Sequence, residues 1–286
     1  MNEKLEYYNG SFCTIKPNHL KERFGSATGK NIKVAVVDSG WDYSQNDLRI
    51  MQGVGLISDK NGFELIFSND YNDRIGHGTA VTDLILQLAP DVSILPIRVF
   101  GSRLETSPDI LVKAISWSIK KEVNIINLSL GTLLSEAIEP LYKICEIARR
   151  KNIIIVASKS NSDDWSYPAI FENSIGVASG DFENQFDYKY FNEEAIECIA
   201  KGYNQYVLWQ GNKREYLSGN SFAAPNITGI ISLILEKYPN ISLENIRTFL
   251  LEYSIWPHQK IFNSTIAFLV QSTYFLNAIN LPHTKV

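Results

Sequence analysis

The sequence predicts one α/β domain, built on a mostly parallel, twisted sheet with helices on both faces. Two observations favour this class. Short apolar runs rich in Val and Ile alternate with longer segments of helical periodicity, and most of these runs are predominantly apolar rather than alternating, as in strands buried on both faces. No internal repeat or linker divides the chain. With 286 residues, 45% of them hydrophobic, it can bury a full core without disulfides.

Six runs are expected to be strands because they are short, apolar and followed by polar or turn-forming residues. In chain order they cover residues 33–37, 93–99, 124–128, 153–157, 174–178 and, more weakly, 195–200.

Four helices are expected between and after these strands. Residues 77–88 place Ala80, Val81, Leu84, Ile85 and Leu88 on one stripe before Pro90 ends the helix. Residues 108–121 form the second helix. Residues 136–151 form the third, which ends in basic residues that suit the helix dipole. The fourth follows Ser221 and is apolar nearly all round, which indicates a buried helix. We therefore expect a domain over residues 31–256, an N-terminal arm over 1–30, and a C-terminal appendage over 257–286 packed on that domain.

Composition excludes several classes of function. A net charge of −4 without a long basic run argues against nucleic acid or a membrane surface as the main partner. No signal peptide and no apolar stretch of about 18 residues is visible. Cys13, Cys145 and Cys198 are too few and too scattered for a disulfide framework or a zinc site, and their odd number fits a reducing compartment. We expect a cytoplasmic protein.

Three residues stand where an α/β sheet gathers its chemistry. Asp38 ends the first strand, His77 opens an amphipathic helix between two glycines, and Ser221 precedes the apolar helix. Each has a structural alternative when taken alone. Asp38 could begin a turn, His77 could pack in the core, and Ser221 could cap a helix.

Together the three segments resemble the subtilisin-like serine proteases over roughly residues 30–250. Residues 34–42 with 47–48, residues 76–79 and residues 219–225 are similar to the family's aspartate, histidine and serine segments, in the same order. The resemblance implies a serine endopeptidase in which Ser221 attacks the scissile carbonyl, His77 moves the proton, and Asp38 orients the imidazole. It also implies that Asn161 donates to the oxyanion, although Ser160 stands where the family usually has glycine.

The resemblance also implies where an extended peptide substrate binds. Ser129, Leu130 and Gly131 match the strand that pairs with the residues before the cut, and Leu104, Glu105 and Thr106 take the place of a second flanking strand. Asp163 and Asp164 fall in the segment that would wall the pocket for the residue before the cut. Solvated surface aspartates are the alternative there. We predict a preference for Arg or Lys at the cleaved residue.

Two features that differ from secreted members of the family bear on the expected metal content and biological role. The stretch from His77 to Ala89 is too short for an inserted calcium loop, so no metal and no cofactor is expected, and residues 1–30 are too few for a folding pro-domain. We therefore expect a monomeric processing protease that removes leader peptides from ribosomally made modified peptides such as lanthipeptides. A general intracellular protease degrading unfolded chains and a silent peptide-binding fold are the alternatives. A nucleotide or phosphate protein using Asp38 is a remote third.

Overall fold

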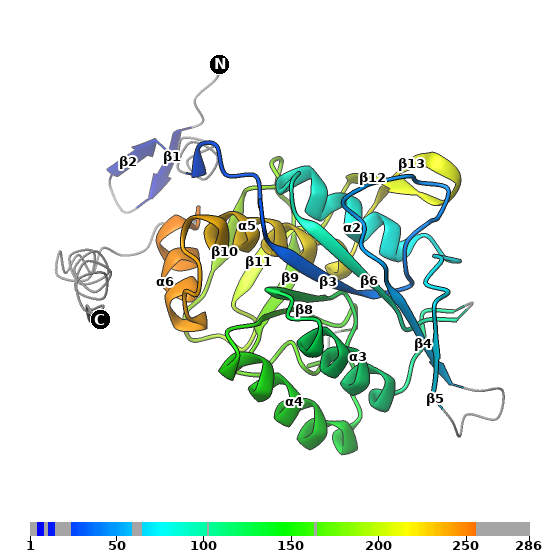
Figure 1. Ribbon diagram of the computed structural model, residues 1–286. Coiled ribbons are helices and arrows are strands. Elements are labelled where there is room, and N and C mark those ends of the chain that lie inside the picture. The colour runs from blue at the N-terminus through cyan, green and yellow to red at the C-terminus, as the bar shows by residue number, and fades with distance from the viewer. Residues whose placement is uncertain are drawn as a thin grey trace, which may run out of the picture. The chain divides into compact units, whose positions relative to one another are not determined.

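A nine-stranded sheet forms the centre of the protein, in the order β10-β11-β9-β8-β7-β3-β6-β4-β5 (Figure 1). Every pairing from β11 to β4 is parallel, and only the outermost pairings, β10 with β11 and β4 with β5, are antiparallel. The strands are β3 (Lys33–Asp38), β4 (Val54–Ser58), β5 (Leu65–Ser68), β6 (Ser93–Arg98), β7 (Ile125–Leu128), β8 (Ile154–Ser158), β9 (Ile175–Gly180), β10 (Tyr188–Tyr190) and β11 (Cys198–Lys201). The predicted fold class is confirmed.

The computed structural model describes residues 5–8, 11–14, 24–58, 65–101, 103–162 and 165–255. The predicted C-terminal appendage lies outside these residues. The predicted N-terminal arm contains a hairpin, in which β1 (Leu5–Tyr8) pairs antiparallel with β2 (Ser11–Thr14). None of the described helices is both long and apolar enough to cross a membrane.

Helices cover both faces of the sheet (Figure 1). On one face α2 (His77–Leu88), α5 (Ala224–Lys237) and α6 (Leu243–Tyr253) share a core with Val34 and Val36 of β3. On the other face α3 (Pro108–Lys120) and α4 (Ile138–Arg150) share a core with Ala35 and Val37. Successive β3 side chains thus enter opposite cores, which explains why the strand is apolar without alternation.

The predicted strands and helices are found with their ends shifted by a few residues. The third helix begins with a 3-10 turn, η1 (Ser135–Ala137), and α2 runs without interruption. The prediction did not include β4, β5, β10, α6 or a second hairpin, β12 (Gln205–Trp209) with β13 (Lys213–Leu217). The exposed side chains of β13 carry no apolar run, so this strand depends on tertiary contacts.

The β12–β13 hairpin is held against α2 by one carboxylate. Asp83 on α2 accepts a hydrogen bond from the backbone N–H of Leu208 at 2.9 Å and forms an ion pair with Arg214 at 3.0 Å. Asp83 is only 8% exposed and its bond to Leu208 is buried, whereas the Arg214 side chain remains partly exposed. The hairpin therefore covers the helix that begins with His77.

Candidate active site

Asp38 and His77 meet at the carboxyl edge of the sheet. Asp38 is the last residue of β3 and His77 the first of α2, and Asp38 Oδ1 lies 2.8 Å from His77 Nδ1. Asp38 is fully buried, and its Oδ1 also accepts the N–H of Ser39 at 2.7 Å. The turn and core-packing alternatives therefore do not describe these two residues, which form a buried carboxylate–imidazole pair.

Small residues make this approach possible. A Cβ added to Gly78 would lie 2.4 Å from the carbonyl oxygen of Gly40, so only glycine lets α2 come this close to the end of β3. The N–H of Gly78 donates to Ser39 Oγ at 2.7 Å, which ties the two segments together beside the pair.

Asp73 organises the first turn of the same helix. Its Oδ1 accepts the N–H groups of Ile75 and Gly76, and its Oδ2 accepts both the N–H and the hydroxyl of Thr79, all within 2.9 Å. Asp73 is 3% exposed. A buried carboxylate with four donors fixes the direction in which His77 enters the site.

The charges around His77 favour its protonated form. Burial opposes the charge, but the carboxylate and hydrogen bond of Asp38 outweigh it and, with a contribution from Asp73, raise the pKa of His77 above its ordinary value of 6.5. This is the electrostatic setting of an imidazole that must accept and hold a proton during a reaction.

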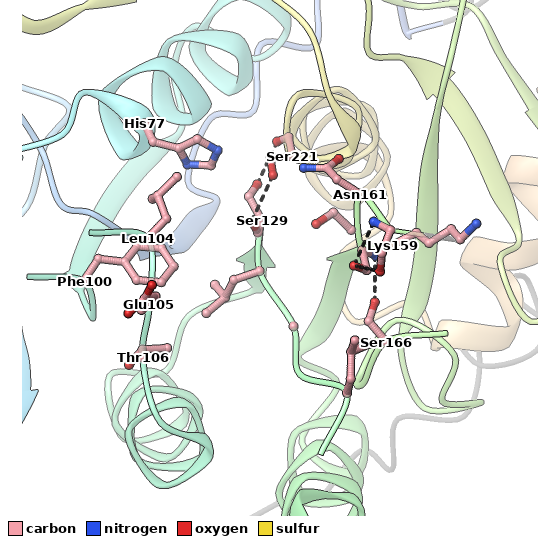
Figure 2. A pocket seen from close by; sticks show the side chains of 16 residues that line it. His77, Phe100, Leu104, Glu105, Thr106, Ser129, Lys159, Asn161, Ser166 and Ser221 are labelled. Carbon is pink, nitrogen blue, oxygen red and sulfur yellow. Dashed lines mark hydrogen bonds between the residues drawn. The ribbon is translucent and has the colours of Figure 1, made fainter. Parts of the chain in front are cut away.

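Ser221 lies in the 3-10 turn η3 (Asn220–Phe222), immediately before α5 rather than on that helix. No side chain caps α5, so Ser221 is not its N-cap. The Ser221 hydroxyl donates instead to the carbonyl oxygen of Ser129 at 3.2 Å. Among the described residues no hydrogen bond joins Ser221 to His77, but both side chains line one pocket (Figure 2).

Asn161 stands beside Ser221. Its Oδ1 accepts the backbone N–H of Asn220 at 3.1 Å, which fixes the orientation of the amide and leaves the Nδ2 donors for other partners. Asn161, which follows β8, is therefore adjacent to η3, the turn that contains Ser221. The hydroxyl of the nearby Ser160 lies 2.8 Å from Ser162 Oγ and accepts the N–H of Ser162 at 3.2 Å.

The pocket that joins these residues has a volume of about 410 Å³. Leu104, Glu105 and Thr106 form one wall, and Ser129 lies between that wall and Asn161 (Figure 2). Leu130 and Gly131 also line the pocket. The structure thus brings together the two segments expected to flank a substrate. Asp163 and Asp164 lie outside the described residues. Lys159 also lines the pocket, but its side chain extends away from His77 and Ser221 (Figure 2).

Other lining residues were missed in the sequence. They are Phe100 and Leu133. Ser158, Ser160, Ser162 and Ser166 also line the pocket, and they lie in residues 158–168, the segment expected to wall it. Phe100 follows the carboxyl end of β6, where the rule for open sheets could have found it. Leu133 lies in a loop and offers no such signal, because the pocket is made by segments far apart in the chain.

Comparison with known proteins identifies the family. Residues 29–267 match the family model described as the subtilase family. The chain is 30% identical to subtilisin DY of Bacillus licheniformis, over 77% of this chain and 82% of that protein. It is 31% identical to the major intracellular serine protease of Bacillus subtilis (strain 168), over 72% of this chain and 69% of that protein. Subtilisin E of the same strain is 27% identical, and the match covers 59% of its length. The chain belongs to the subtilase family.

This subtilase is a serine endopeptidase, as the resemblance of the three motifs implied. In the described part of the chain no group of three or more His, Cys, Asp or Glu side chains is arranged to hold a metal ion. Cys145 and Cys198 are buried free thiols, and burial raises the pKa of Cys145 to about 12, so this thiol stays protonated and inert.

Proposed function

We propose that this subtilase cleaves peptide bonds with Ser221 as nucleophile, His77 as general base and acid, and Asp38 as the group that orients the imidazole. One observation carries the proposal: the buried 2.8 Å contact between Asp38 and His77 opens onto the pocket that Ser221 also lines. Asp38 accepts from Nδ1, which leaves Nε2 to take the Ser221 proton and pass it to the leaving amine.

The proposed oxyanion donors are Asn161 Nδ2 and the backbone N–H of Ser221. The contact from Asn220 N–H to Asn161 Oδ1 supports this role, because it turns the amide so that its donor end is free. A donor held in advance stabilises the negative charge as it develops on the carbonyl oxygen and costs no reorganisation.

Ser129, Leu130 and Gly131 are proposed to pair with the substrate backbone, facing Glu105 on the other wall. A Cβ on Gly131 would lie 2.8 Å from the carbonyl oxygen of Tyr167, so position 131 has no room for a side chain. A substrate N–H that bonds to the Ser129 carbonyl would replace the Ser221 hydroxyl there and release it toward His77. Binding and alignment of the nucleophile are then one event.

The proposed biological role is the removal of leader peptides from ribosomally made modified peptides, by a monomer in the cytoplasm. Leu104 and Leu133, each about half exposed, and Glu105 give the pocket both apolar and acidic contacts that select among peptides. The preference for Arg or Lys at the cleaved residue belongs to this proposal. Residues 31–256 are proposed as the catalytic domain.

General degradation of unfolded proteins is the second candidate. The 31% identity to the major intracellular serine protease of Bacillus subtilis favours it. Mass spectrometry of products from a diverse peptide pool separates the two. Cleavage confined to a narrow set of sites after Arg or Lys supports a processing enzyme, whereas cleavage after many residue types supports degradation. The Ser221→Ala variant is the control. If the native protein binds peptides but cleaves none, it is a catalytically silent peptide-binding protein and not a protease.

A further inference from the structure

Three polar side chains and one backbone carbonyl form a continuous series of hydrogen bonds beside the site. Thr228 Oγ1 donates to Asn127 Oδ1 at 2.8 Å, and Asn127 Nδ2 donates to Ser129 Oγ at 3.1 Å. Ser129 Oγ donates to the carbonyl oxygen of Ser221 at 2.9 Å. This series of hydrogen bonds therefore connects α5 and β7 to Ser129, which follows β7, and to the backbone of Ser221.

The burial of this series is unusual for polar groups. Asn127 and Thr228 are both 0% exposed, and Ser129 is 5% exposed. Asn127 sits between Ile126 and Leu128 in β7, a strand in the middle of the sheet. Burying an amide there is costly unless both of its ends are bonded, and here one end is bonded to α5 and the other to Ser129.

The directions of the bonds matter because Ser129 has one hydroxyl proton. Asn127 Nδ2 occupies the acceptor side of Ser129 Oγ, so the proton of that hydroxyl is directed at Ser221. Thr228 holds the amide of Asn127 from the opposite side and prevents it from turning. Each donor in the series thus has one acceptor, and the orientation of Ser129 is fixed from beneath.

We propose that Asn127 and Thr228 are positioning residues, which act through Ser129 Oγ to hold Ser221 and the substrate-pairing segment in register. The inference rests on the proposed function of Ser221 and of Ser129, Leu130 and Gly131. Neither Asn127 nor Thr228 lines the pocket, so their effect reaches the reaction only through Ser129. Errors of about 1 Å in such alignment can cost about 10²-fold in rate.

Thr228→Val tests the proposal because valine keeps the shape of threonine and removes only the hydroxyl. We expect kcat for a cleaved peptide to fall about 5- to 50-fold, with KM changed less than twofold. Rates are measured per active site titrated with a fluorophosphonate, so that loss of folded enzyme does not count as loss of kcat. Thr228→Ser, which restores the hydroxyl, should return kcat to within twofold of the native value.

A double-mutant cycle identifies the route. If Thr228 acts through Ser129 Oγ, Thr228→Val has no further effect on kcat in a Ser129→Ala background. Equal effects in both backgrounds, or an unchanged kcat in Thr228→Val, would overturn the proposal. Thr228→Ala replaces Thr228→Val in the same cycle if the valine variant does not fold.

Ser232→Ala is the matched control on the same helix. Ser232 is 0% exposed, and its hydroxyl donates to the carbonyl oxygen of Thr228 at 2.8 Å, outside the chain of bonds to Ser129. We expect Ser232→Ala to lower the melting temperature and leave kcat unchanged. If both hydroxyl deletions lower kcat equally, the effect is general softening of α5 and the proposal fails. If the native chain cleaves nothing and Ser221 takes no fluorophosphonate, the proposed function fails instead.

Discussion

Ser129 and Ser221 are joined by two hydrogen bonds of opposite direction. Ser129 Oγ donates to the carbonyl oxygen of Ser221 at 2.9 Å, and Ser221 Oγ donates to the carbonyl oxygen of Ser129 at 3.2 Å. One bond fixes the backbone of Ser221, and the other holds its hydroxyl in place. The first can persist while a peptide binds, whereas the second must break before Ser221 can reach His77.

Asp38→Asn should lower kcat by about 10⁴ without changing the fold, because an amide cannot stabilise the charged imidazole and favours the wrong tautomer. Steady-state kinetics on a cleaved peptide measures the loss, and circular dichroism checks the fold. An Asp38→Asn enzyme with more than a tenth of native kcat would contradict the role assigned to Asp38.

The pH profile should report the charge of Asp73. Only neutral His77 can accept the Ser221 proton, so kcat/KM should rise with pH through the pKa of His77, with a midpoint above 6.5. Asp73→Asn removes a negative charge that favours the imidazolium, so the midpoint should move to lower pH by a few tenths of a unit.

Asp83→Asn is the control for this shift. Asp83 lies on the same helix and is similarly buried, but it bonds to Leu208 and Arg214 and does not contribute to the pKa of His77. Its loss should leave the midpoint in place. Equal shifts in the two variants would indicate a displaced helix rather than a lost charge.

Asn161→Ala should reduce kcat by about 10²–10³ with little change in KM, the size of effect known for this donor in subtilisins. Asn161→Asp keeps the oxygen that accepts the Asn220 N–H and replaces the Nδ2 donor with an acceptor. It should therefore be at least as impaired. An active Asn161→Asp enzyme, measured with the same peptide, would exclude the oxyanion role.

Gly78→Ala should disrupt the Asp38–His77 pair, because the new Cβ would meet the backbone of Gly40 at 2.4 Å and force α2 away from β3. We expect kcat to fall at least tenfold and the melting temperature to drop. Gly101→Ala is the matched control, since nothing lies within 4 Å of a Cβ at that position. A wild-type kcat in Gly78→Ala would mean that the approach of the two elements is not required.

Glu197 should make stability depend on pH. Burial raises the pKa of Glu197 to about 7, against the opposing effect of its 2.7 Å ion pair with Arg247. The folded state therefore holds a proton that the unfolded state releases near pH 4.5, so this contribution to stability is present at low pH and is lost as pH rises to about 7. The change is on the order of 1–3 kcal/mol.

Urea unfolding of Glu197→Gln between pH 4.5 and 7 measures this contribution. The glutamine variant should lose less stability than the native protein as pH rises across that range. Parallel curves for the two proteins would show that Glu197 has the same pKa in both states.

Local patterns in the sequence were enough to predict the central elements and the three motifs. The strands β3, β6, β7, β8 and β9 could be predicted from apolar runs because parallel strands are buried on both faces. Asp38, His77 and Ser221 each stand at an element boundary within a distinctive short motif. The edge strands and the β12–β13 hairpin could not be predicted, because they depend on contacts such as that of Asp83 with Arg214.

The fold class, the family and the order of the three motif residues could be predicted from the residues alone, because they follow from short-range periodicity and local residue types. The partners of those residues depend on how distant segments pack in the folded protein. The tertiary structure set Asp38 Oδ1 at 2.8 Å from His77 Nδ1, and it joined Asn127 to Thr228 across 101 positions of the chain. A buried polar side chain has no periodic signature, since its bonding is satisfied by whatever the folded core brings beside it.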